Sequence, residues 1–309
     1  MDHIGLYQQI SRNNRRSVLL LIAFPALILF GLYAVLFFSF QPNFEEVNYL
    51  FLRLIPFVLV GVAIWFFIAF KFNTAIINHT TKAKPLERKE NMRVYNLTEN
   101  LCISVGMKMP DLFVINSNAL NAFASGINEK NFAVTLTSGI INQLDDAELE
   151  GVIAHELTHI RNRDVRLLII SIIFVGIFGF LVEILFRSLL YGGGRKKDSK
   201  IDGRVMMIAL IVGVVVYFFS ILFKFSLSRK REYLADAGAV EMTKNSMALA
   251  SALRKISGNH DLDLDSEDVK QMFIENTPKK ENNLMASISG LFATHPPIEK
   301  RIAILERGL

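Results

Sequence analysis

Long apolar runs separated by polar segments organise this chain. The first run, Val18 to Phe40, contains no charged residue, and the second, Leu54 to Phe70, follows Arg53. A helix needs about 20 apolar residues to cross a bilayer. The first run has that length, and the second reaches it when the charged end of Arg53 extends toward the membrane surface. The pattern predicts two transmembrane helices, at about 18–40 and 50–70.

A second pair of apolar runs follows later. Leu167 to Leu190 is interrupted only by Glu183 and Arg187, which stand four apart and can pair on one helix face. Val205 to Phe223 has no charge. The linker between the runs, Tyr191 to Arg204, is basic, which disfavours its transfer across a membrane. We expect two full crossings, with a shallow hairpin as the alternative.

Charge around the first pair of runs predicts their orientation. The segment from Gln41 to Tyr49 carries two glutamates and no lysine or arginine, whereas both outer flanks are basic. Lysine and arginine are enriched in the cytoplasmic segments of membrane proteins. The N-terminus and the chain after Lys71 are therefore expected in the cytoplasm.

The polar segment after Lys82 predicts a soluble domain with short strands. Leu112 to Ile115 is an alternating apolar segment, and Asn121–Ala124 and Phe132–Leu136 flank turn residues at Gly126–Asn128. Two short strand-like runs around a glycine-containing turn are typical of a β-hairpin.

A helix that begins at Asp146 follows this hairpin. Asp145 with Glu148 three residues later is a capping-box pattern, and the helix is expected to run through His159 toward Arg163.

This helix carries the motif His155-Glu156-Leu157-Thr158-His159. Histidines four apart lie on one helix face about 6 Å apart along the axis, so both imidazoles reach one divalent metal. Glu156 then flanks the open coordination position. The motif is typical of a zinc hydrolase, and a surface helix that carries these residues by chance is the alternative.

The composition places part of the chain in lipid. Hydrophobic residues make up 51% of it and the mean hydropathy is +0.34, which is too apolar for an ordinary soluble protein. The net charge of +5 could indicate nucleic-acid binding. The basic residues cluster beside apolar runs, however, so membrane topology explains them better.

Two histidines leave at least one protein ligand to be found. The single cysteine, Cys102, excludes a cysteine-rich site, so the missing ligand is a histidine or a carboxylate. Glu232 and His295 are the leading candidates, with Asp164 and Asp236 behind them.

Height along the helices helps to choose among these candidates. If the motif helix continues into the run that starts at Leu167, His159 lies about 12 Å from the membrane edge. Glu232 lies about 10 Å beyond Phe225, at a similar level. This favours Glu232 as the third ligand and Asp236, one turn on, as an acceptor for a ligand imidazole. A solvated carboxylate in a charged stretch is the alternative for Glu232.

The motif set resembles one protease family. His155-Glu156-Leu157-Thr158-His159 is followed by Arg161-Asn162-Arg163-Asp164, then by Glu232-x-x-x-Asp236 and by His295-Pro296-Pro297. With a basic N-terminus and paired apolar runs, this set resembles the M48 family of membrane zinc metalloproteases, in particular its HtpX-type members. The resemblance covers nearly the whole chain.

The resemblance implies one zinc ion per chain, three ligands and a glutamate base. The implied ligands are His155, His159 and Glu232, and the implied base is Glu156. His295 is expected to donate to the oxyanion of the tetrahedral intermediate. Asp164 is expected either to orient His159 or to cap a neighbouring helix.

An extended substrate is best held by adding a strand to an exposed sheet edge. The candidate edge consists of Asn121, Ala122, Phe123 and Ala124, with the Asn121 amide bonding the substrate backbone. An internal turn is the alternative.

These expectations describe a mainly α integral membrane protein, with a helical anchor and an α+β zincin-like (gluzincin) protease domain that carries the motif on a helix beside a small β-sheet. The expected parts are an N-terminal membrane hairpin at 1–75, a first protease part at 76–166, a second apolar helix pair at 167–223 and a second protease part at 224–309.

The expected function is zinc-dependent cleavage of misfolded or damaged membrane proteins on the cytoplasmic side of a bacterial inner membrane, in quality control and stress response. The expected partners are unfolded or membrane-protein substrates and the lipid bilayer, without nucleic acid. A processing protease of the same family that trims prenylated (CAAX-type) proteins is one alternative. A non-catalytic zinc-binding membrane adaptor is another, which the retained Glu156 disfavours because structural zinc needs no adjacent base.

Overall fold

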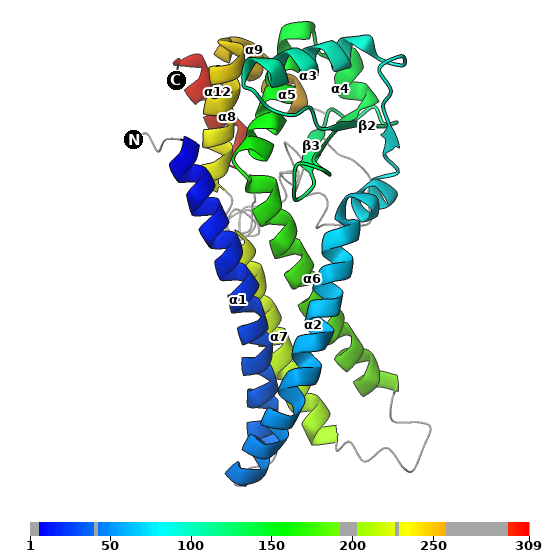
Figure 1. The fold of residues 1–309 in the computed structure, drawn as a ribbon, viewed down its shortest axis with the longest axis vertical. Coiled ribbons are helices and arrows are strands. Elements are labelled where there is room, and N and C mark those ends of the chain that lie inside the picture. Colours follow the sequence, from blue (N-terminus) through cyan, green and yellow to red (C-terminus); the bar gives the residue numbers. More distant parts are fainter. Residues whose placement is uncertain (1–5, 40–42, 192–202, 226–228, 258–295, 309) are drawn as a thin grey trace, which may run out of the picture. The chain divides into compact units, whose positions relative to one another are not determined.

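The computed structural model describes residues 6–39, 43–191, 203–225, 229–257 and 296–308. The chain divides into two compact units (Figure 1). The helical unit comprises Arg15–Lys71 and Ile170–Lys224, and the sheet unit comprises Met1–Asn14, Phe72–Ile169 and Phe225–Leu309. Each unit is therefore assembled from segments that are far apart in the sequence.

The helical unit takes parts of four long helices: α1 (Leu6–Ser39), α2 (Phe44–Thr81), α6 (Asp164–Tyr191) and α7 (Gly203–Phe225). Among the described residues, three helices contain a stretch that is long and apolar enough to cross a membrane, namely Ile10–Ser39, Phe44–Thr81 and Asp164–Arg187. In α7 the corresponding described stretch, Arg204–Ser220, is shorter.

The four apolar runs of the sequence are thus helical. The helices α1 and α2 extend well beyond the predicted ranges, because no glycine or proline separates the apolar runs from their polar flanks.

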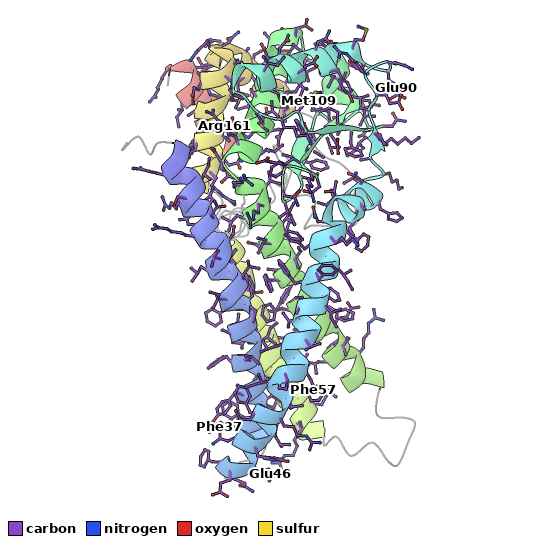
Figure 2. The ribbon with its side chains drawn as sticks, in the orientation of Figure 1. Phe37, Glu46, Phe57, Glu90, Met109 and Arg161 are labelled. Atoms are coloured by element: carbon purple, nitrogen blue, oxygen red, sulfur yellow. The ribbon has the colours of Figure 1, made fainter. Side chains whose placement is uncertain are left out.

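Aromatic rings join three helices of this unit. Phe24 of α1 stacks on Phe174 of α6 with ring centroids 4.6 Å apart, and the Phe66 ring of α2 lies 5.4 Å from the same Phe174 ring. Other large apolar side chains face outward, and Phe57 on α2 is 71% exposed (Figure 2). Extensive exposed apolar surface of this kind is typical of contact with a membrane.

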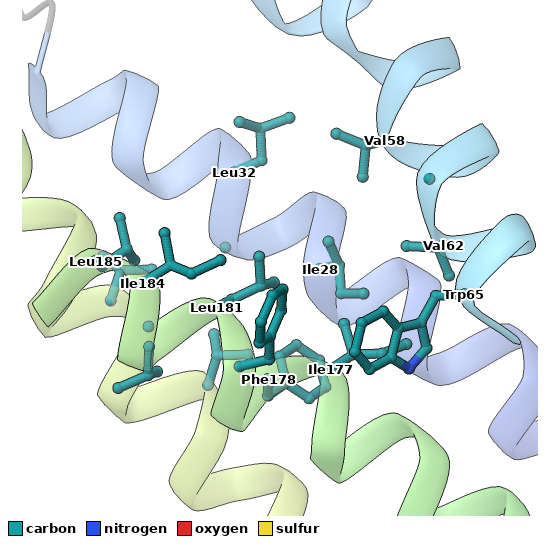
Figure 3. A pocket seen from close by; sticks show the side chains of 17 residues that line it. Ile28, Leu32, Val58, Val62, Trp65, Ile177, Phe178, Leu181, Ile184 and Leu185 are labelled. Atoms are coloured by element: carbon teal, nitrogen blue, oxygen red, sulfur yellow. The ribbon is translucent and has the colours of Figure 1, made fainter. Parts of the chain in front are cut away.

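A cavity of about 480 Å³ lies among the helices of this unit (Figure 3). All four helices contribute apolar side chains to its wall, among them Ile28, Val62, Phe178 and Val216. A Cβ atom at Gly61, also on the wall, would meet nothing within 4 Å. The helices therefore contact one another without filling the space between them.

The sheet unit contains a four-stranded mixed sheet in the order β1-β2-β4-β3. Its strands are β1 (Lys84–Pro85), β2 (Asp111–Ile115), β3 (Ala122–Ser125) and β4 (Ala133–Thr137). The strands β2 and β4 run parallel, whereas β3 and β4 form an antiparallel hairpin. The strands and the hairpin predicted from the sequence are confirmed.

Gly126 allows the chain to leave β3 toward β4. Its φ of +98° is a conformation that side chains disfavour. A Cβ atom there would also lie 2.1 Å from the carbonyl oxygen of Asn131. Any other residue at this position would therefore distort the hairpin.

Six helices complete the described part of the sheet unit, together with the ends of the long helices. They are α3 (Met92–Ser104), α4 (Ser138–Gln143), α5 (Asp146–Arg161), α8 (Arg229–Thr243), α9 (Ser246–Ile256) and α12 (Ile298–Glu306). The helix α5 lies at the centre, in contact with β3, α3, α8 and α9 (Figure 1). Its Val152, Ala154 and Leu157 are fully buried, so α5 forms the middle of the core.

Residues close in sequence determine where α5 begins and ends. At its start, Asp145 and Glu148 form the predicted capping box. At its end, Arg163 adopts a left-handed conformation with φ of +62°, and α6 begins at the next residue. This break separates α5 from α6. The motif helix therefore does not continue straight into the third apolar run, as the height comparison for Glu232 assumed.

Glu148 also joins α5 to α9. Its carboxylate accepts hydrogen bonds from Ser251 Oγ at 2.7 Å and from Lys255 Nζ at 2.6 Å. Burial raises the pKa of this carboxyl, but the hydrogen bonds from Lys255, Ser251 and the Asp145 backbone outweigh burial, so its pKa is lowered overall. The charged form is therefore the one that the fold stabilises.

We expect Glu148→Gln to lower stability by about 1–3 kcal/mol at pH 7. Since the folded pKa is depressed, the contribution of the carboxylate is present above its unfolded pKa of about 4.3 and is lost as the pH falls through the folded value. Denaturant unfolding of both proteins at pH 7 and below pH 4 measures the difference. A gap that stays constant between the two pH values would contradict this assignment.

Candidate metal centre

Three ligand-type side chains from two helices converge in the sheet unit. His155 and His159 lie one turn apart on α5, and Glu232 stands in the first turn of α8. The two histidine Nε2 atoms are 3.2 Å apart. Carboxylate oxygens of Glu232 lie 3.6 Å from His155 Nε2 and 3.5 Å from His159 Nε2. The structure thus brings together the three residues that the sequence singles out as ligands.

These three side chains lie close enough together to hold a metal ion, with one ligand atom from each within 4.8 Å of the others. Ligand atoms held about 2.0–2.1 Å from zinc at tetrahedral angles lie about 3.3 Å from one another. Two imidazole nitrogens and one carboxylate oxygen also form a donor set that zinc hydrolases use. Among the described residues, His155, His159 and Glu232 form the one group of histidine and acidic side chains that is close enough to hold a metal ion.

Burial supports the same interpretation of Glu232. The residue is 5% exposed, which excludes a solvated carboxylate on a wet helix face. Its carboxylate faces the two histidines and Arg301, whose Nη1 lies 3.6 Å away. A buried carboxylate requires such partners.

The helix α8 approaches α5 closely because Gly238 faces Thr158. A Cβ atom at position 238 would lie 2.4 Å from Thr158 Cγ2, so the helices have no room for a side chain there. Thr158 is itself held by its Oγ–H, which donates to the Ala154 carbonyl at 2.8 Å. This glycine therefore sets the distance between the helices that carry the ligands.

Each ligand imidazole faces a carboxylate on its other nitrogen. His155 Nδ1 lies 2.9 Å from Asp236 Oδ1, and His159 Nδ1 lies 3.2 Å from Asp164 Oδ2. A carboxylate at Nδ1 favours the tautomer that presents Nε2 to a metal and fixes the ring orientation. Asp236 and Asp164 are therefore placed to orient the histidines.

Arg301 of α12 lies beside Asp236, the carboxylate that faces His155. Its side chain is fully buried, and it donates to Asp236 through Nε at 2.9 Å and through Nη2 at 2.7 Å. Two parallel hydrogen bonds of this kind hold both partners in a fixed geometry. Arg301 thus connects the C-terminal helix to the carboxylate that faces His155.

The charges shift one another's protonation. Burial lowers the pKa of His155, but the nearby Asp236 and Glu232 carboxylates outweigh burial and raise its pKa to about 9. Burial raises the pKa of Asp236, whereas Arg301 and His155 lower its pKa to about 2 overall. The two carboxylates thus favour the protonated form of His155, and a metal ion competes with protons for such a group.

The two expected catalytic residues are Glu156 and His295. Glu156 follows His155 on α5 and is 2% exposed. His295 lies outside the described residues. The chain resumes at buried Pro296, and Pro297 then precedes α12.

The candidate substrate strand lies at the sheet edge with buried side chains. The strand β3 lies at the sheet edge, as expected, but Ala122, Phe123 and Ala124 are at most 4% exposed and Asn121 is 1% exposed. Asn121 Oδ1 accepts from the Ala122 backbone N–H at 2.9 Å. The apolar side chains of this strand pack against α5, and its role in substrate binding stays a prediction.

Sequence analysis missed two buried residues that support the centre. In the sequence, Arg301 looks like an ordinary basic residue of a short terminal helix. Asn13 looks like an ordinary polar residue before an apolar run. Asn13 Nδ2 donates to Asp164 Oδ1 at 2.7 Å. The one signal for Arg301 was its place in the segment that follows His295-Pro296-Pro297.

Comparison with known proteins identifies the family of the chain. The profile of Peptidase family M48 matches residues 88–308. The chain therefore belongs to peptidase family M48.

Within this family, the similarity is to HtpX-type proteases. The "Protease HtpX homolog" of Bacteroides fragilis is 53% identical over 322 aligned residues, which cover 99% of this chain and 100% of the relative. The protein of the same description from Ligilactobacillus salivarius is 35% identical over 97% of this chain and 99% of its own length. The family and the membrane-length helices together define a membrane metalloprotease.

A solved structure shows a more distant likeness. The crystal structure of S. mikatae Ste24p aligns with 96% of this chain at 20% identity and a TM-score of 0.49. The chain spans 66% of the length of that protein.

The buried position of Arg301 generates a stability prediction. We expect Arg301→Leu to destabilise the protein by about 3–5 kcal/mol, because it removes the guanidinium that forms two hydrogen bonds with the buried Asp236 carboxylate. Arg301→Lys should restore little of this loss, since an ammonium cannot form the two parallel hydrogen bonds. Denaturant unfolding of the purified variants measures both effects. Full stability in Arg301→Leu would show that Asp236 does not depend on Arg301, and full stability in Arg301→Lys would show that a cation suffices without the two parallel hydrogen bonds.

Proposed function

We propose that this protein is a zinc metalloendopeptidase that cleaves misfolded or damaged membrane proteins on the cytoplasmic side of a bacterial inner membrane. The proposal assigns it to protein quality control and the stress response. One observation carries it: His155, His159 and Glu232 meet at ligand distances, and Glu156 stands beside them on the same helix. A structural zinc site would need the ligands but no adjacent base.

In the proposed reaction, Glu156 performs the proton transfers. Zinc, when bound by His155, His159 and Glu232, supplies a Lewis acid for the scissile carbonyl and lowers the pKa of the attacking water. Glu156 accepts the proton of that water and passes it to the leaving amine. Its burial keeps competing water away from the carboxylate.

Two further residues complete the proposed machinery. His295 donates a hydrogen bond to the oxyanion that forms on the substrate carbonyl. Asn121 and the strand that follows it remain the proposed place for a substrate backbone. A strand added at this edge would pair with the backbone of β3, whose side chains are buried in the core.

The proposed substrate class follows from the position of the centre in the chain. Asp164, which faces His159, is also the first residue of α6, whose stretch Asp164–Arg187 is long and apolar enough to cross a membrane. A centre attached to such a helix works close to the bilayer surface. Loops and tails of membrane proteins are therefore the segments that we expect it to reach most easily.

Three variants of the full-length protein test the reaction in detergent with added zinc and an unfolded protein substrate. We expect Glu156→Gln to lower cleavage at least about 100-fold while it retains bound zinc, because it removes the base and keeps the ligands. Glu232→Ala should lose both zinc and cleavage. Glu150→Gln, the same substitution six residues earlier on α5, is the matched control and should cleave like the native protein.

Each departure from these results has its own meaning. Native-like cleavage by Glu156→Gln would remove Glu156 as the base, and retained zinc in Glu232→Ala would remove the third ligand. No cleavage by the native protein, with zinc bound, would favour the non-catalytic adaptor.

Cysteine labelling tests the proposed topology, in a background where the single Cys102 is replaced by serine. We expect Glu45→Cys to react with a membrane-impermeant maleimide in intact spheroplasts, and Glu90→Cys to react only after lysis. Lys197→Cys, in the linker outside the described residues, should react from the outside when both later runs cross fully. Labelling of Lys197→Cys only after lysis would instead establish the shallow hairpin.

A further inference from the structure

We propose that Asn13, in the N-terminal part of α1, positions Asp164 and through it His159, so that this helix completes the metal centre. This inference rests on the proposed metal-dependent function and adds to it a positioning residue from a segment outside the matched family profile. The first membrane-length helix thereby acquires a role in the chemistry besides that of an anchor.

The contacts of Asn13 are short and buried. The residue is 3% exposed, and its Nδ2 donates to Asp164 Oδ1 at 2.7 Å and to the Asn162 carbonyl at 2.8 Å. Both partners are acceptors, so the two hydrogens of the amide nitrogen have one acceptor each. This fixes which end of the Asn13 amide faces Asp164.

Asp164 transmits this contact to the ligand. One carboxylate oxygen, Oδ1, accepts from Asn13, and the other, Oδ2, lies 3.2 Å from His159 Nδ1. The Asp164 backbone carbonyl accepts from Arg231 Nη1 at 3.3 Å. With both oxygens and the backbone engaged, the carboxylate has one orientation, and the His159 ring is directed toward the other ligands.

The place of Asn13 in the chain explains why an external donor is needed. Asn162 caps the end of α5, and a carbonyl at a helix end has no partner within its own helix. The left-handed Arg163 then turns the chain into α6. Asn13 bonds to the residues on both sides of Arg163, so it holds the break and the carboxylate beyond it together.

The neighbouring Asn14 provides a matched control. It is the same residue type on the same helix, and its buried Oδ1 has no hydrogen-bond partner. Replacing either asparagine by alanine should favour the helix slightly. Loss of helix stability therefore cannot account for a difference between the two variants in metal binding.

The test measures zinc affinity of the full-length protein by chelator competition, and the visible absorption of its Co²⁺ form. We expect Asn13→Ala to weaken zinc binding about tenfold and to alter the Co²⁺ spectrum. Asn13→Asp should weaken it further, because it places a second carboxylate against Asp164. Asn14→Ala should match the native protein in both measurements. Native-like affinity and spectrum in both Asn13 variants would overturn the proposal.

A double-mutant cycle tests whether Asn13 acts through Asp164. In an Asp164→Ala background, Asn13→Ala should cause no further loss of zinc affinity. Equal losses in both backgrounds would overturn the proposed route. Zinc affinity and the Co²⁺ spectrum can both be measured without proteolysis. The proposed reaction and the proposed role of Asn13 can therefore be refuted independently. Cleavage by Glu156→Gln would refute the proposed reaction alone, whereas unchanged metal binding in the Asn13 variants would refute the positioning role alone.

Discussion

The burial of charge between α5, α8 and α12 is the constraint on which the rest of the structure depends. His155, Glu232, Asp236 and Arg301 are all at most 5% exposed, although each carries or can carry a charge. Charges are tolerated in such a place only when they are paired and hydrogen-bonded. A shift of any one of the three helices would leave a charge without its partner. The close packing at Gly238 and the central place of α5 in the core therefore hold the helices where these charged side chains remain paired.

Features that local sequence determines were predictable. The capping pair Asp145 and Glu148 marked the start of α5, and the spacing of His155 and His159 placed both imidazoles on one face of that helix. The turn at Gly126 marked the hairpin, because few residues other than glycine adopt its backbone conformation. The apolar runs gave the membrane-length helices, since no soluble fold needs such stretches.

Features that depend on contacts between distant segments were not predictable. Nothing near Arg301 or Asn13 in the sequence indicates that each packs against an aspartate more than 60 residues away. The break at Arg163 is hidden for a related reason, because arginine has no intrinsic preference for a left-handed conformation and tertiary contacts impose it. The burial of β3 likewise comes from its packing against α5, which no alternation within four residues reveals.

The order in which the parts of the centre occur along the chain has a consequence for biosynthesis. Asn13 is made first, the two histidines near the middle, Glu232 after the last apolar run, and Arg301 after all of them. A ribosome-bound chain therefore holds its histidines for some time without the carboxylate of α8 and the guanidinium of α12. The centre can be completed only after the membrane-length helices have been made. With Glu232 as the proposed third ligand, the nascent chain cannot hold its metal through all three side chains until α8 has been made.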